Sequence, residues 1–204
     1  MVPTERGTRA WTRLAPDYDT WLALVERWFL AAGRRWLVWR ASGDVLEVGI
    51  GTGANLSYYA RGAVRLTGLD PSPGMLDAAR TKADGLGLDV TLVEGDAMAL
   101  PFPDASFDTV VSTLVLCGVP EVRGALAEMV RVLRPGGQLL LADHVVSSNP
   151  AVRLGQKVLE AVTKRVWGEY WTRRPRLVVE ELGLSIVATR RRTFGVLEDV
   201  HART

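Results

Sequence analysis

Residues 45–55 read Val-Leu-Glu-Val-Gly-Ile-Gly-Thr-Gly-Ala-Asn, an apolar run that passes directly into a glycine-rich loop. The run from Val45 to Val48 predicts a buried strand, and a helix is expected from about Ala54 to Ala60. Glycines suit the junction because the chain turns sharply there and its backbone can approach a ligand closely. The stretch therefore predicts the first strand and loop of an α/β fold.

Short apolar runs and helical patterns alternate after this loop. Further strands are predicted at residues 64–69, 90–93, 107–114 and 138–142, and two closing strands at 184–189 and 196–202. A helix begins at Ser72-Pro73, where serine suits the cap and proline the first helical position. Another covers residues 121–133, with its apolar side chains at helical spacing, before the Pro-Gly-Gly of 135–137.

Five strands alternating with helices are typical of βαβ units and a parallel sheet covered on both faces. The sequence predicts an α/β fold: a doubly wound, Rossmann-like, seven-stranded and mostly parallel sheet with helices on both faces and an antiparallel edge hairpin. The 204 residues fit one domain. Within it we expect an N-terminal helical lid (1–40), a core (41–149), a helical substrate-side segment (150–183) and closing strands (184–204).

Composition favours a cytoplasmic, soluble protein. Cys117 is the single cysteine, so no internal disulfide can form. No apolar stretch approaches the ~20 residues of a membrane span, and residues 1–11 lack the apolar core of a secretory signal. The net charge of +2 divides into +3 over 1–40, −6 over 41–149, +5 over 150–176 and zero over 177–204. The basic flanks suit an anionic partner or a solvated surface.

Acidic residues follow three successive strands of the predicted sheet. Glu47 precedes the glycine loop, Asp70 follows 19 residues after Gly51, and Asp96 comes after the third strand. Carboxyl ends of parallel strands meet at one crevice, where Asp70 can accept hydrogen bonds from ribose hydroxyls. Taken alone, Asp96 fits a turn residue better.

The glycine spacing alone also fits a dinucleotide fingerprint. Glu47 argues against this, since its carboxylate would repel a pyrophosphate and attract the ammonium of a methionine moiety. Asp70 indicates a nucleoside without choosing between the two.

Five motifs carry a resemblance to a known family: EVGIGTGAN, GLDPSPGML, EGDAMALPFPDASFD, VVSTLVLCGV and RVLRPGG. Over about Tyr18 to Ala142 the chain resembles class I S-adenosylmethionine-dependent methyltransferases of the ubiquinone/menaquinone-methyltransferase-like (type 11) group. With Asp143-His144-Val145, its motifs most resemble alkyl-thiol methyltransferases, and phosphatidylethanolamine N-methyltransferases look similar. The resemblance implies S-adenosyl-L-methionine as cofactor and S-adenosyl-L-homocysteine as product.

The resemblance also implies which residues contact the cofactor, and Thr52 and Gly53 complete the loop. The expected set is Glu47, Gly49, Ile50, Gly51, Thr52, Gly53, Asn55, Asp70, Pro71, Met75, Asp96, Ala97 and Ser112. No metal is expected.

Methyl transfer mainly requires the nucleophile, methyl group and sulfur to be held in line. His144, at the crevice rim, is the candidate base, with Asp143 as its orienting partner; a loop contact is the alternative. Tyr18 is the second candidate catalytic residue, through cation–π contact with the sulfonium, or else a packing anchor. Cys117 fits the core better than a nucleophile.

The acceptor is left open by the sequence. Aromatic and basic residues interleave over 11–40 and 150–176, which favours a small, apolar acceptor (thiol, hydroxyl or amine) and allows peripheral membrane contact. The alternatives are a phospholipid N-methyltransferase at the membrane surface, a catalytically silent cofactor-binding module and a nicotinamide-dependent reductase. No nucleic-acid-binding module is recognisable, and the oligomeric state is left open.

Overall fold

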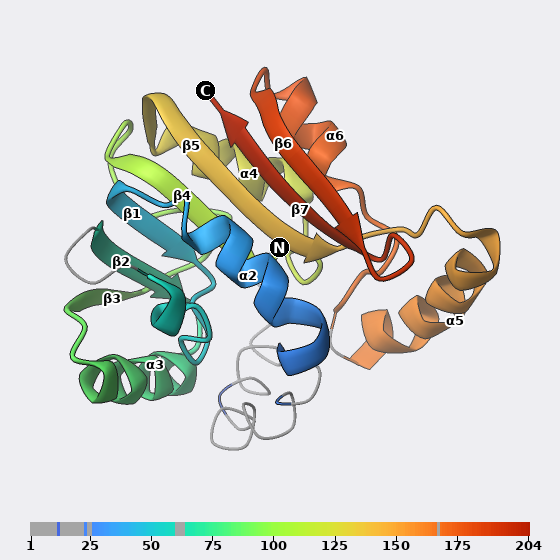
Figure 1. Cartoon of the computed structure of the whole chain (residues 1–204), viewed down its shortest axis with the longest axis horizontal. Helices are drawn as coiled ribbons and strands as arrows, with labels where there is room; N and C mark the ends of the chain where they lie inside the picture. Colours follow the sequence, from blue (N-terminus) through green and yellow to red (C-terminus); the bar gives the residue numbers. More distant parts are fainter. Residues whose placement is uncertain (1–11, 13–22, 24–25, 60–63, 167) are drawn as a thin grey trace.

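A computed structural model describes residues 12, 23, 26–59, 64–166 and 168–204 (Figure 1). The chain enters through a π-helical turn, η1 (Glu26–Leu30), and helix α2 (Ala31–Val38). The strands are β1 (Gly43–Val48), β2 (Val64–Asp70), β3 (Val90–Glu94), β4 (Phe107–Thr113), β5 (Leu133–His144), β6 (Ser185–Arg192) and β7 (Leu197–Arg203). Between them lie η2 (Leu56–Tyr58), α3 (Pro73–Leu86), α4 (Val122–Arg131), α5 (Pro150–Val166) and α6 (Pro175–Glu181).

The strands form one seven-stranded sheet in the order β3-β2-β1-β4-β5-β7-β6. Strands β1 to β5 pair in parallel, and β7 runs antiparallel between β5 and β6. The order reverses between β1 and β4, so their carboxyl ends open a crevice, which is where open α/β sheets bind ligands. The predicted fold class and the antiparallel edge pair are both confirmed.

The central strands are apolar on both sides because helices cover both faces of the sheet (Figure 1). Leu46 of β1 and Val110 of β4 belong to a core that α4 and α6 complete. Their neighbours Val45 and Val111 belong to a second core, which includes side chains of α2 and α3. This alternation gives the doubly wound arrangement and fixes the crevice between two packed layers.

The helix α3 begins as the sequence predicts, with the Ser72 hydroxyl capping the Met75 N–H and Pro73 in the first turn. Two predicted boundaries are wrong. The helix expected at 54–60 is a short 3₁₀ turn, Leu56–Tyr58, after a run of turns. The fifth strand is longer than 138–142 because residues 133–137 and 143–144 also belong to it.

None of the helices in the described part of the chain is long and apolar enough to cross a bilayer.

Candidate functional site

The glycine loop after β1 is built from positive φ angles. Gly49, Gly51 and Gly53 have φ of 70°, 55° and 79°, which other L-residues rarely adopt. A Cβ on Gly49 would collide with the Val115 side chain, so the loop packs closely on the segment after β4. A Cβ on Gly51 would meet no atom of the described residues within 4 Å. The backbone at Gly51 therefore faces open space in the crevice.

Asp70, at the end of β2, is held against this loop. Its Oδ2 accepts from the Gly51 N–H at 3.0 Å and its Oδ1 from the Ser72 N–H at 2.9 Å. The side chain is 8% exposed, and burial raises its pKa. Each carboxylate oxygen can accept a further hydrogen bond, so Asp70 is fixed in orientation while keeping acceptor capacity.

Glu47, in the strand before the glycine loop, is fully buried. Its Oε1 accepts from the Asn55 amide and its Oε2 from the Tyr59 hydroxyl, both at 2.8 Å. Burial is the largest influence on its pKa, which is raised to about 7. The site thus holds a carboxylate that is only half ionised near neutral pH.

Arg34 brings a positive charge from α2 to the same network. Its Nη1 donates to Asn55 Oδ1 at 3.1 Å and to Thr113 Oγ1 at 2.7 Å, and Nε pairs with Glu26 at 2.9 Å. Arg34 is 9% exposed. Glu47 and Arg34 therefore lie on either side of the Asn55 amide, one accepting from it and the other donating to it.

The end of β4 completes the crevice wall. The Ser112 hydroxyl is buried and has no hydrogen-bond partner among the described residues. Leu114 adopts φ 58° in the left-handed region, which costs a non-glycine residue energy and concentrates at functional sites. The unpartnered Ser112 hydroxyl can still form a hydrogen bond, and its contact with a ligand stays a prediction.

The remaining sequence-predicted positions lie on the same edge of the sheet. Ile50, Thr52, Met75 and Ala97 are buried, and Pro71 is half-buried. Asp96 is half-buried, and its Oδ1 accepts from the Met98 N–H at 2.9 Å, the turn bond that fits this residue taken alone. Contact of these residues with a ligand stays a prediction.

His144 ends β5 and stacks on Trp171, with ring centroids 4.0 Å apart and planes 12° apart. Burial lowers its pKa to about 4, so the ring is neutral at pH 7. Its Nδ1 and the Trp171 indole Nε1 are both buried without a partner among the described residues. Asp143 does not orient this ring in the structure, because its oxygens accept from the backbone N–H groups of His144 and Cys117.

Asp143 and Cys117 form a buried cluster with His144, whose potential ligand atoms all lie within 4.8 Å of one another. Burial raises the pKa of the Cys117 thiol, and Asp143 reinforces the shift, so the cysteine is a protonated core residue. Burial also raises the pKa of Asp143 to about 6. The expectation that no metal binds stays a prediction.

An arch formed by residues 169–173 covers this end of the sheet. The Tyr170 N–H donates to the Cys117 carbonyl, and the Arg173 guanidinium donates to the Leu116 and Val119 carbonyls. Glu160 of α5 accepts from the Trp171 N–H at 2.6 Å. These bonds hold Trp171 against His144 and make the arch part of the site.

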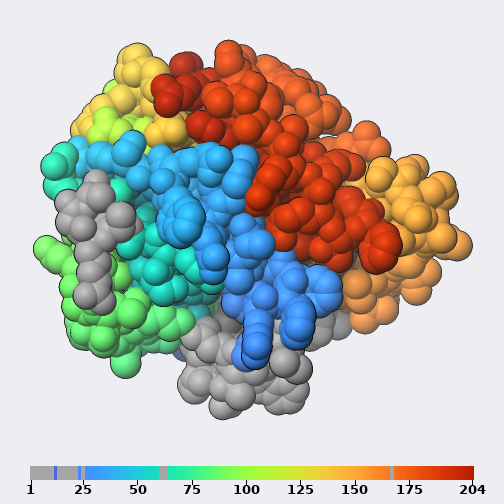
Figure 2. All heavy atoms as spheres, viewed as in Figure 1, coloured from blue at the N-terminus to red at the C-terminus, as the bar shows by residue number. Residues whose placement is uncertain are grey.

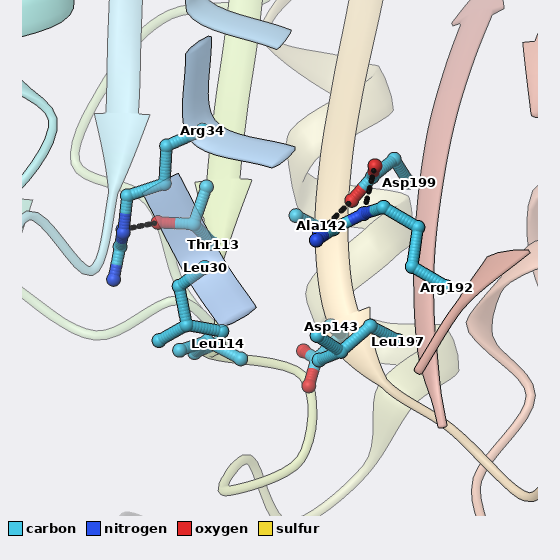
Figure 3. A pocket seen from close by; sticks show the side chains of 9 residues that line it. All are labelled: Leu30, Arg34, Thr113, Leu114, Ala142, Asp143, Arg192, Leu197 and Asp199. Atoms are coloured by element: carbon cyan, nitrogen blue, oxygen red, sulfur yellow. Dashed lines mark hydrogen bonds and ion pairs between the residues drawn. The ribbon is translucent and has the colours of Figure 1, made fainter. Parts of the chain in front are cut away.

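A small hollow with a cavity volume of about 10 Å³ lies between α2 and the ends of β4, β5 and β7 (Figure 3). Its wall mixes apolar and charged side chains: Leu30, Arg34, Thr113, Leu114, Ala142, Asp143, Arg192, Leu197 and Asp199. Gly33 permits the Arg192–Asp199 ion pair to approach α2, since a Cβ there would lie 2.8 Å from Asp199 Oδ1.

The structure brings Glu47 and Asn55 into contact and ties Asp70 to the glycine loop. The bonds of Arg34, Tyr59 and Thr113 to Glu47 and Asn55 were not predicted from the sequence. The sequence pattern that could have indicated Arg34 is helical spacing. Arg34 lies three and four residues before Leu37 and Val38, which are both buried, so it shares their face of α2. Tyr18 lies outside the described residues. Of the tryptophans expected to line a pocket, Trp28 and Trp39 are exposed, whereas Trp171 lies at the site.

Comparison with known proteins gives this geometry a family. Residues 46–141 match the family model described as a methyltransferase domain. A phosphatidylethanolamine N-methyltransferase of Cereibacter sphaeroides is 40% identical over 57% of this chain and 58% of its own length. A demethylmenaquinone methyltransferase of Listeria welshimeri is 33% identical over 79% of this chain and 71% of its own.

The chain spans a little over half the length of several curated relatives it matches. Among solved structures, a SAM-dependent methyltransferase from Thermotoga maritima covers 94% of this chain, and the chain covers 97% of it, with a TM-score of 0.70 at 21% identity. That likeness shows the fold, and the Listeria relative shows the family. The chain belongs to the S-adenosylmethionine-dependent methyltransferases.

Proposed function

We propose that this protein transfers a methyl group from S-adenosylmethionine to a small, apolar acceptor by in-line displacement. The carrying observation is the buried arrangement of Glu47 and Arg34 around Asn55, with Asp70 on the neighbouring strand. The cofactor's methionine end is a zwitterion, and its ribose offers two hydroxyl donors. A carboxylate, a guanidinium and a second carboxylate match these three groups in charge and hydrogen bonding.

The described residues fit the cofactor. The Ser112 hydroxyl has no hydrogen-bond partner among the described residues. The open space at Gly51 allows a ligand to approach the backbone of the loop. When bound, the cofactor supplies a methyl group already activated by the sulfonium. The protein then has to position the acceptor and exclude water, and such positioning can lower the barrier by ~7–11 kcal/mol.

Arg34→Gln should weaken S-adenosylhomocysteine binding about 10- to 100-fold, because the methionine carboxylate loses a charge-assisted partner. Arg35→Gln is the matched control, since Arg35 is the exposed neighbour on α2. Calorimetric titration of both variants measures the difference. Equal affinities of the two variants for S-adenosylhomocysteine would show that Arg34 does not contact the cofactor.

We assign the polar atom of the acceptor to the His144–Trp171 pair. The imidazole Nδ1 and the indole N–H have no hydrogen-bond partners among the described residues, so as an acceptor and a donor they suit a thiol or hydroxyl. With its pKa near 4, His144 is a weak base at neutral pH. The imidazole therefore accepts a hydrogen bond from the thiol or hydroxyl of the substrate. It takes that group's proton only as methyl transfer proceeds.

His144→Asn should lower kcat about 100-fold with a thiol or phenol acceptor and leave S-adenosylhomocysteine affinity unchanged. Trp171→Phe keeps the ring stack but removes the N–H, so it should raise KM for the acceptor more than it lowers kcat. His201→Asn, a buried histidine on β7, controls for loss of an imidazole. Steady-state kinetics that are unchanged in His144→Asn would contradict the assignment.

The function is tested by incubating the protein with labelled S-adenosylmethionine and a panel of thiols, phenols, amines and phospholipids. Transfer to a small apolar compound supports the proposal. Transfer only to phospholipid would instead favour the alternative that the relative from Cereibacter sphaeroides suggests. Cofactor binding without transfer to any compound would indicate a catalytically silent module.

A further inference from the structure

Helix α5 carries its apolar side chains on the outside and its polar ones on the inside. Gln156 and Thr163 are buried, whereas Leu154, Val158, Leu159 and Val162 are 66%, 65%, 42% and 58% exposed. We call these four residues the outer face of α5. A helix packed on a globular core shows the opposite arrangement, with its apolar stripe turned inward.

Hydrogen bonds fix α5 in this orientation. Gln156 accepts from the Ser147 N–H at 2.7 Å and donates to the Val145 carbonyl at 2.8 Å. The Thr163 hydroxyl donates to the Glu169 carbonyl, and Glu160 holds the Trp171 and Thr172 N–H groups. Rotating the helix to bury its apolar side would leave these groups unpaired, at a cost of about 1–3 kcal/mol each. The outer face of α5 is therefore held toward the surroundings.

A further exposed apolar side chain lies in the turn between β6 and β7, which is bonded to the segment before α5. Phe194 in that turn is 77% exposed, with φ 56°. Its carbonyl accepts from the Ser147 hydroxyl at 2.6 Å, three residues before α5 begins. Helix α5 stands at one end of the molecule, away from the sheet, and this turn lies beside the loop that leads to it (Figures 1 and 2).

The charge around this surface is positive. Lys157, Lys164 and Arg165 are exposed on α5, and the helix's single acidic residue, Glu160, turns its carboxylate inward to the arch. A second copy of the same face, paired about a two-fold axis, would bring like charges together. An anionic lipid surface instead complements both the bases and the apolar side chains.

We propose that the outer face of α5, together with Phe194, docks the protein onto an anionic bilayer, with the helix lying in the plane of the interface. With 17 residues, five of them basic or acidic, α5 lies on a membrane and does not cross it. Since Glu160 and Gln156 connect α5 to the arch, docking places the covered site beside the membrane surface.

Flotation of the full chain with phosphatidylcholine vesicles, with and without phosphatidylglycerol, tests the proposal. We expect the protein to float only with the anionic vesicles and to dissociate from them at high salt. Val158→Gln should reduce binding about tenfold and the further change Val162→Gln more, because each removes apolar area from the interface. Val187→Gln changes a valine of β6 that is 53% exposed and lies outside this face, and the variant should bind as the unchanged protein does.

A charge reversal separates lipid docking from general stickiness. Lys157→Glu should weaken binding more than about fivefold, the contribution of one base near an anionic surface, whereas Arg203→Glu at the end of β7 should not. Equal loss in both variants, absence of vesicle binding, or a dimer in analytical ultracentrifugation that Val158→Gln dissociates would overturn the proposal. Flotation needs no acceptor and no catalysis, so its failure leaves the proposed function standing.

Discussion

Glu47→Gln should raise the stability of the ligand-free protein by about 3 kcal/mol well above pH 7 while weakening S-adenosylhomocysteine binding about 10- to 100-fold. The two effects have one cause. Burial raises the pKa of Glu47 from 4.5 to about 7, so ionising this carboxylate inside the protein costs free energy that the unfolded chain does not incur. In the proposed function, the same negative charge attracts the cofactor's ammonium.

The pH dependence follows with a definite sign. The folded protein holds the Glu47 proton more tightly than the unfolded chain, so this residue's contribution is fully present below pH 4.5 and is lost as pH rises through about 7. Cofactor binding runs the other way and strengthens as Glu47 ionises. Denaturant unfolding and calorimetry across this range measure both trends.

Other buried groups shape the same curves, so the comparison is made between the two proteins at each pH. Burial raises the pKa of Asp143 to about 6 and lowers that of His144 to about 4, and both are unchanged in Glu47→Gln. The difference between the two stability curves should therefore grow from pH 4.5 to 7. A constant difference would show that Glu47 does not titrate in this range.

Asp70→Asn should weaken S-adenosylhomocysteine binding at least about 100-fold, because two ribose hydroxyls lose a charged acceptor, each worth ~1.5–3 kcal/mol. The carboxylate accepts from the Gly51 and Ser72 N–H groups, and an asparagine can accept from only one of them through its single oxygen. The loop geometry therefore loosens as well.

Asp77→Asn is the control for this prediction. Asp77 is an exposed carboxylate on α3, paired with Arg80 at the surface, where such pairs contribute little. The affinity of Asp77→Asn for S-adenosylhomocysteine should match that of the unchanged protein. Circular dichroism establishes that both variants are folded, and an affinity within a few-fold of the unchanged protein for Asp70→Asn would exclude the ribose contact.

The strands and the cofactor loop could be predicted because their signals are local. Buried parallel strands are continuous apolar runs, and the run at 45–48 and the glycines after it give a strand and a positive-φ loop without reference to the rest of the chain. The pattern of strands and helices likewise predicts the two-sided sheet. The 3₁₀ turn at Leu56–Tyr58 was not predicted because it depends on distant contacts. The side chains of Asn55 and Tyr59 bond to Glu47, and the chain does not continue as a helix.

The partners of the site were not readable because they depend on contacts far apart in sequence. Periodicity does not say which of Arg34 and Arg35 is buried; the Thr113 hydroxyl, 79 residues away, decides it. The orientation of α5 could not be predicted for the same reason. The spacing of its residues shows that the helix has an apolar and a polar face. Hydrogen bonds to the polar groups at 145–147 and 169–172 turn the polar face inward.

We propose that Glu47, Arg34 and Asp70 form a site for S-adenosylmethionine and not for a dinucleotide. Titration calorimetry of the unchanged protein with S-adenosylhomocysteine and, separately, with NAD tests it most directly. We expect S-adenosylhomocysteine to bind with one site per chain and NAD to give no heat of binding. Binding of NAD without binding of S-adenosylhomocysteine would contradict the claim.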